Sequence, residues 1–107
     1  MESLKNIPEL PTSLKELIPI QPGQIVSMAL SKNEKINITL FGIAEGESIS
    51  EEAYATDTLY YILEGEASLS FDAKNCILKT GDCIAVPAGT LHAVVGQSAF
   101  KMLQITL

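Results

Sequence analysis

Turn residues divide the chain into short segments from residue 24 onward, and this spacing limits the folds that the chain can adopt. Runs rich in β-branched and aromatic residues alternate with turn sequences centred on Gly46, Gly65 and Gly81. No helix is predicted among these runs that is long enough to serve as the crossover between parallel strands. The pattern predicts an all-β antiparallel fold of eight or nine strands, with runs at residues 25–30, 35–44, 58–63, 67–71, 76–78, 83–86, 92–95 and 100–107.

Residues 1–22 have a different character, because they hold four of the five prolines and one stretch with helical features, residues 12–18. Ser13 followed by Glu16 fits a capping box at a helix start. Leu14, Leu17 and Ile18 recur at the three- and four-residue spacing of one helix face. We expect a short helix that packs against the domain or against a partner subunit, followed by a single domain over residues 23–107.

Size and charge argue against several classes of function. A chain of 107 residues has room for one domain. It carries seven lysines, no arginine and thirteen acidic residues, so we expect no nucleic-acid partner, which would need clustered cationic donors. Its longest apolar runs are too short to span a membrane, and its start lacks the pattern of a secretory signal peptide. We therefore expect a cytoplasmic protein without a membrane partner.

Strand spacing alone does not choose between a jelly roll, an immunoglobulin-like sandwich and an up-and-down barrel. Two glycine-bounded motifs add the missing information. The first reads Gly46, five residues, Glu52-Ala53-Tyr54, three residues, Thr58, six residues and Gly65; the second reads Gly81, five residues, Pro87, one residue, Gly89, two residues, His92, three residues and Gly96. They resemble the paired motifs of the cupin superfamily, G-x5-H-x-H-x3-E-x6-G and G-x5-P-x-G-x2-H-x3-N. The resemblance implies an antiparallel jelly-roll β-barrel, the double-stranded β-helix, with a pocket at one mouth and commonly a homodimer.

The chain departs from the cupin pattern at the positions that hold metal ligands in metal-binding members. There the family carries two histidines, a glutamate and a third histidine, whereas this chain has Glu52, Tyr54, Thr58 and His92. A carboxylate can ligate a divalent metal, so Glu52 and His92 are the remaining candidate ligands for manganese, iron, zinc, nickel or copper. Glu52 also fits a solvated acid in an acidic run, and Thr58 is too short to replace a ligating glutamate.

The same positions are candidates for a ligand pocket that needs no metal. Strand alternation places Tyr60 on the inward face with Tyr54 and Thr58. It turns Tyr61 and Leu63 to the opposite face, which is the expected side for a partner subunit. Asp57 is one residue off the motif, so it is either a weak candidate ligand or a hydrogen-bond partner for a loop.

Two further residues belong to this predicted pocket. His92, the only histidine, is the candidate general acid or base, alone or paired with Glu52. Gln104 joins the pocket if Phe100, Met102, Gln104 and Thr106 point inward, and the opposite parity would bury Leu103, Ile105 and Leu107 instead. The sequence leaves both parities open.

Three functions fit this residue set, and fold alone does not choose among them. The favoured one is binding of a small metabolite in the barrel mouth without a complete metal site. The first alternative is a divalent-metal cupin enzyme, an isomerase, lyase or oxygenase acting on a small acid or sugar derivative. An anionic substrate fits poorly, because the chain has no arginine and a net charge of −6. The second alternative is a structural or regulatory dimeric module.

Overall fold

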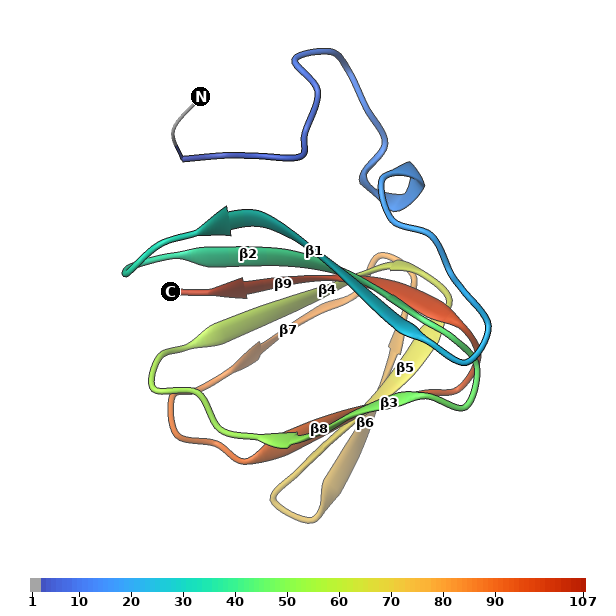
Figure 1. Cartoon of the computed structure of the whole chain (residues 1–107). Helices are drawn as coiled ribbons and strands as arrows, with labels where there is room; N and C mark the ends of the chain where they lie inside the picture. The colour runs from blue at the N-terminus through green and yellow to red at the C-terminus, as the bar shows by residue number, and fades with distance from the viewer. Residues whose placement is uncertain (1–2) are drawn as a thin grey trace.

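Nine strands follow the turn pattern of the sequence in the computed structural model, which describes residues 3–107 (Figure 1). Seven to eight residues form each of the longest strands, and the shortest has four. The strands are β1 (Ile25–Lys32), β2 (Asn37–Ile43), β3 (Ser48–Glu52), β4 (Thr58–Glu64), β5 (Glu66–Phe71), β6 (Lys74–Lys79), β7 (Cys83–Val86), β8 (His92–Gly96) and β9 (Phe100–Thr106).

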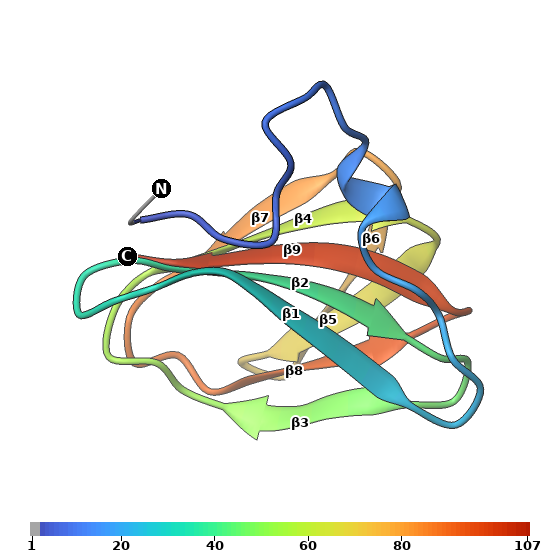
Figure 2. The same cartoon turned by 45° about the horizontal axis from the view of Figure 1, so that its top comes forward.

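The strands pair as a nested series of antiparallel partners. β5 pairs with β6, β4 with β7, β3 with β8 and β2 with β9, and β1 extends the sheet beside β2. The result is a five-stranded sheet of order β1-β2-β9-β4-β7 facing a four-stranded sheet of order β3-β8-β5-β6 (Figures 1 and 2). Such nested pairing is that of a jelly roll. The predicted all-β antiparallel fold is confirmed, but the strands of residues 3–107 form two separate sheets and not one closed barrel.

One strand was missing from the sequence prediction. β3 contains Ile49 as its only large apolar residue, with serine or glutamate at its other positions. Such a segment lacks the apolar run that signals a strand. It forms because β8 lies beside it and supplies the backbone partners, with Ile49 opposite Val94 and packed against the core.

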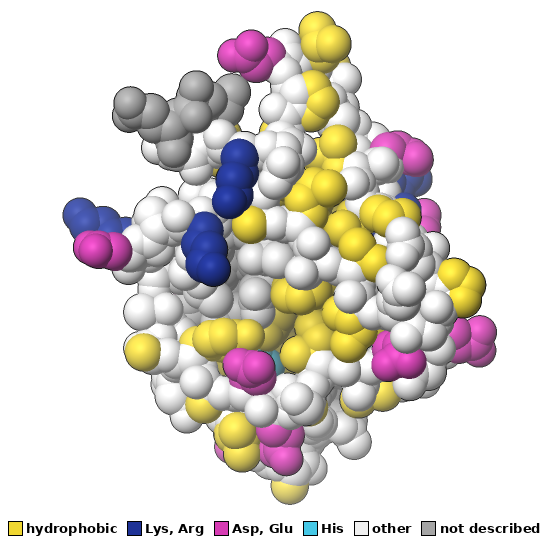
Figure 3. All heavy atoms as spheres, viewed as in Figure 1, with side chains coloured by type: hydrophobic (Ala, Val, Ile, Leu, Met, Phe, Trp, Pro, Cys, Tyr) yellow, Lys and Arg dark blue, Asp and Glu magenta, His cyan; other side chains and the backbone are white. Residues whose placement is uncertain are grey.

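The main core fills the space between the two sheets, where Figure 3 shows hydrophobic side chains gathered. The parity of the last strand, which the sequence left open, is settled by burial: Phe100, Met102, Gln104 and Thr106 all point inward and are buried. The buried hydrophobic members of this core are Ile43, Tyr60, Ile62, Ala67, Leu69, Leu78, Val86, Val94, Phe100 and Met102.

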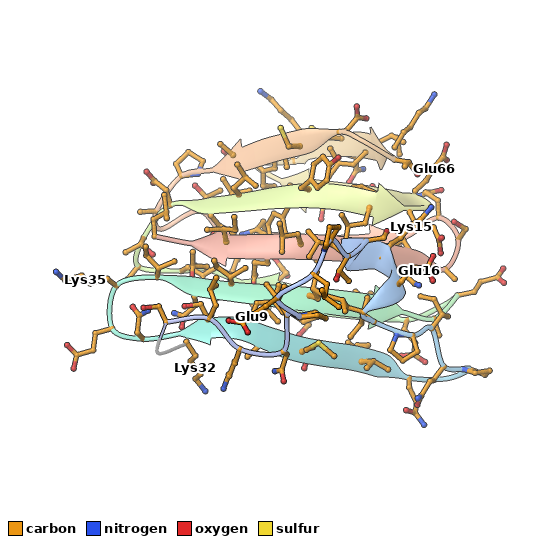
Figure 4. All side chains as sticks on the ribbon, turned by 90° about the horizontal axis from the view of Figure 1, so that it is seen from above. Glu9, Lys15, Glu16, Lys32, Lys35 and Glu66 are labelled. Atoms are coloured by element: carbon orange, nitrogen blue, oxygen red, sulfur yellow. The ribbon has the colours of Figure 1, made fainter. Side chains whose placement is uncertain are left out.

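A second apolar cluster lies on the opposite face of the five-stranded sheet, beneath the N-terminal segment (Figures 2 and 4). Ile18 is 1% exposed and contacts the strand residues Leu30 and Leu40. The segment passes so close to the sheet that a Cβ on Gly42 would overlap the carbonyl oxygen of Pro19. The N-terminal residues therefore act as a cover for one face of the domain.

The predicted N-terminal helix and its capping box are wrong in detail. The helical part is a single 3-10 turn, Leu14–Glu16, and the Ser13 side chain makes no capping hydrogen bond. Pro11 and Pro19 bracket the segment, and proline disfavours helical backbone in the residue before it and cannot continue a helix itself. The turn lies over the strands with Lys15 and Glu16 on it (Figure 4).

The same cluster affects the predicted dimer. Leu63 packs against the N-terminal residues of its own chain, so this part of the expected partner-facing surface is already covered. The homodimer stays a prediction. Among residues 3–107, the structure has no helix with the length and hydropathy needed to cross a membrane.

Candidate functional site

One end of the space between the sheets is polar, and the strand register shows why. Across the five-stranded sheet, Asn37, Thr106 and Thr58 stand side by side at this end. The next inward-facing row contains Thr39, Gln104 and Tyr60. The two rows beyond are apolar, with Met102 and then Phe100 on β9. We call the polar end of the sandwich the mouth.

The turn before β8 delivers His92 to the mouth. Gly89 in this turn has a φ of 78°, a left-handed conformation that glycine adopts without steric cost. The Ala88 amide donates to Asp57 Oδ1 over 2.8 Å, and the Gly89 amide donates to the Tyr54 carbonyl over 2.8 Å. Asp57 is therefore the hydrogen-bond partner of the loop, which is one of the two roles that the sequence allowed.

His92 is 3% exposed, and both of its ring nitrogens have hydrogen-bond partners. Nδ1 lies 2.9 Å from the Thr90 carbonyl oxygen, and Nε2 lies 2.7 Å from the Tyr60 hydroxyl. The Gln104 Nε2 amide donates to the Tyr60 and Tyr54 hydroxyls, each over 3.2 Å. Four side chains from β9, β4, β8 and the segment before β4 thus form one connected network at the mouth.

Burial raises the pKa of the Tyr60 hydroxyl from 10.0 to about 12. Desolvation is the largest cause, and the nearby Tyr54 and Glu52 add to the rise, whereas the hydrogen bond from Gln104 opposes it. Tyr60 therefore keeps its proton at neutral pH and is available as a hydrogen-bond donor inside the network.

A cavity of about 370 Å³ opens at the mouth beside this network. Two predicted pocket residues, Tyr54 and Gln104, line it. Tyr60, Thr58 and His92 are buried behind them, and Glu52 lies exposed at the end of β3, opposite His92 in the strand register. The remaining lining comes from β1, β2 and the end of β9: Ser27, Ala29, Ser31, Lys32, Asn37, Thr39 and Thr106.

Sequence reasoning missed this wall of the cavity. A usable signal was present, because small polar residues alternate with larger apolar ones in β2, where Asn37 and Thr39 flank Ile38. A strand with one polar and one apolar face normally turns the polar face to solvent. Here the apolar face is covered by the N-terminal segment, so the polar face is the one that faces the cavity.

The donor set does not fit the metal site of metal-binding cupins. Only one imidazole is present, and its Nε2 already contacts the Tyr60 hydroxyl. Tyr54 is engaged by Gln104, and Thr58 offers only a hydroxyl. In the described part of the chain, no three His, Cys, Asp or Glu side chains are grouped to hold a metal ion. A firm site normally needs three or four protein donors, which Glu52 and His92 alone do not supply.

Comparison with known proteins agrees with the fold and the motifs. The family model described as the Cupin domain matches residues 39–106. The chain belongs to the cupin family. A comparison with curated proteins gives no match.

Comparison with solved structures extends the similarity to nearly the whole chain. A cupin superfamily protein from Desulfitobacterium hafniense is 50% identical, with a TM-score of 0.95, covering 97% of this chain and 96% of that one. A conserved protein of unknown function from Streptococcus pyogenes is 28% identical, with a TM-score of 0.96 and coverage of 100% and 95%. A Cupin 2 conserved barrel domain protein from Leptotrichia buccalis is 34% identical, with a TM-score of 0.85, covering 88% of this chain but 46% of that one.

Proposed function

We propose that this cupin binds a small polar metabolite by hydrogen bonds at its mouth, without a metal ion. The observation that carries the proposal is the cavity of about 370 Å³, whose lining consists mostly of hydroxyl and amide side chains. Ligand sites for small molecules have volumes from about 300 Å³ upward and use a few fixed polar groups to orient the ligand. The volume of this cavity suits a compact metabolite.

The hydrogen-bond network supports binding, because it holds part of the cavity wall in place. Gln104 lines the cavity and is fixed from behind by the Tyr60 hydroxyl, which in turn contacts His92. Groups held in one geometry lose little conformational entropy when a ligand arrives. The wall is therefore arranged before the ligand binds.

Elemental analysis tests the metal-free part of the proposal. The protein is purified in metal-free buffer and measured before and after incubation with manganese, iron, zinc, nickel or copper. We expect far less than one metal per chain in every case. Near one metal per chain, reduced by His92→Ala or Glu52→Ala, would contradict the proposal and favour a metal-dependent cupin enzyme.

A binding screen tests the site itself. Backbone amide NMR spectra are recorded with monosaccharides, polyols and short hydroxy acids, and the perturbed residues are mapped onto the cavity. Thr39→Val should weaken binding of the best compound roughly fivefold, because one hydrogen bond contributes about 1 kcal/mol. The matched control is Ser68→Ala on β5, whose neighbours Ala67 and Leu69 point into the core. Equal effects of both changes would contradict a ligand in this cavity.

A further inference from the structure

The donor and the acceptor in each hydrogen bond at the mouth can be assigned in turn, starting from the Thr90 carbonyl. We call this order the direction of the network. A carbonyl oxygen only accepts, so the His92 Nδ1 that lies 2.9 Å from it must carry the proton. In a neutral imidazole with the proton on Nδ1, the other nitrogen, Nε2, has a free lone pair and can only accept. The Tyr60 hydroxyl, 2.7 Å away, therefore donates its single proton to Nε2.

This assignment fixes the orientation of the Gln104 amide. Since the single proton of the Tyr60 hydroxyl is used in the hydrogen bond to His92, its oxygen can only accept from its second neighbour, which must be a donor. The Gln104 group facing Tyr60 is therefore the NH₂ group, as found at 3.2 Å. The second N–H of the same group points to the Tyr54 hydroxyl, also at 3.2 Å.

Two polar atoms are then left for a ligand. Among the described residues, Thr58 Oγ1 is the one fully buried side-chain oxygen or nitrogen without a hydrogen-bond partner. Gln104 Oε1 also has no partner, so it is not fully buried, and it can be reached from the cavity that Gln104 lines. It offers an acceptor. Tyr54 accepts from Gln104, and its own proton has no partner within residues 3–107, so it offers a donor beside the acceptor.

We infer that the ligand is a neutral hydroxylated compound, such as a polyol or monosaccharide, whose hydroxyl donates to Gln104 Oε1 and accepts from the Tyr54 hydroxyl. A carboxylate fits poorly, because it has no proton to donate to Oε1. The one cationic side chain of the cavity lining, Lys32, is exposed and lies level with Thr106, two residues beyond Gln104 on β9. This inference rests on the proposed function and adds the ligand class to it.

The experiment compares probes in which each hydroxymethyl group is replaced by a carboxylate, so that the acid has no hydroxyl to donate. Ethylene glycol is titrated against oxalate, and 1,3-propanediol against malonate, while the side-chain amide signals of Gln104 are followed by NMR. We expect the neutral member of each pair to bind at least about tenfold more tightly, the loss expected when a buried acceptor faces an acceptor. Tighter binding of the acids would overturn the inference and leave the proposed function standing. Failure of all four probes, together with the wider screen, to perturb the cavity would overturn both.

Variants test whether the network is the cause. Tyr60→Phe removes the group that orients Gln104, so the preference for the neutral probe should fall toward equal binding. Tyr61→Phe is the matched control on the outward face of the same strand and should keep the preference. If Tyr60→Phe does not fold, Tyr54→Phe removes the cavity donor, together with one acceptor of the Gln104 amide, from a half-buried residue and should weaken neutral probes about tenfold. An unchanged preference in these inward-face variants would overturn the inference.

Discussion

The two ends of the space between the sheets are built from the same strands but serve different purposes. On β9, Phe100 and Met102 at one end are fully buried in the hydrophobic core, whereas Gln104 and Thr106 at the other end line the cavity. The alternation of side chains is the same throughout. What changes is the chemistry of the inward residues, so one strand contributes stability at one end and recognition at the other.

Glycines show the same contrast. At the apolar end, a Cβ on Gly65 would overlap the Ala99 carbonyl, and one on Gly96 would meet Phe100. At the mouth, Gly89 has no neighbour within 4 Å of such a Cβ and is needed only for its positive φ. The apolar end is closed by tight packing of the backbone, whereas the turn at the mouth leaves space.

The largest expected effect comes from the apolar end. Phe100→Ala should lower the free energy of unfolding by about 3–5 kcal/mol, because it removes a fully buried aromatic ring and leaves a cavity. Urea denaturation measures this loss. Leu10→Ala, at a residue 74% exposed, is the control and should change stability very little. Equal losses would show that the core does not lie where the structure places it.

The second effect concerns Tyr60, at the boundary between the two ends. Its pKa is raised in the folded protein, so its contribution to stability is complete below pH 10.0 and is lost as the pH approaches about 12, where the folded state also ionises. Over this range wild type should lose about 2–3 kcal/mol more than Tyr60→Phe. Equal alkaline losses in the two proteins would contradict the burial of this hydroxyl.

A smaller effect is expected at the turn that carries His92. Asp57→Ala removes the acceptor for the Ala88 amide and should cost about 1–2 kcal/mol, together with a shift of the His92 ring signals. Asp57→Asn keeps an acceptor oxygen and should retain most of the stability and the ring signals of wild type. If Asp57→Ala has the stability and the His92 ring signals of wild type, the hydrogen bond from Ala88 to Asp57 does not position His92.

The smallest effect has the opposite sign. Thr58 Oγ1 is buried without a partner among the described residues, so Thr58→Val should raise the stability by about 1 kcal/mol. Thermal denaturation measures the gain. A loss of stability instead would mean that this hydroxyl is hydrogen-bonded in solution.

The sequence predicted the elements that depend on local patterns. The glycine and proline spacing predicted the turn before His92, and alternation predicted that Tyr60 points inward. Gln104 was left open because both faces of β9 carry apolar residues, and both are covered: one by the core and the other, with Leu103, by the N-terminal segment. That segment is distant from β9 in the sequence, so no local pattern in β9 indicates that its outer face is covered.

The hydrogen bonds of the site lay beyond sequence reasoning for the same reason. His92 and Tyr60 are 32 residues apart, and Gln104 and Tyr54 are 50 apart. Their contact follows from the register of the two sheets, which no short motif encodes. The polar wall from β1 and β2 was missed because its strands lie outside both glycine motifs.

The tautomer of His92 tests the central claim most directly. Because His92 is the only histidine, a long-range ¹H–¹⁵N NMR spectrum of uniformly labelled protein shows a single imidazole and needs no assignment. For the neutral ring we predict a proton on Nδ1 and an unprotonated, hydrogen-bonded Nε2. A proton on Nε2 would reverse every donor and acceptor in the network and turn the Gln104 amide around. It would contradict the assignment of Gln104 Oε1 as the acceptor that faces the ligand.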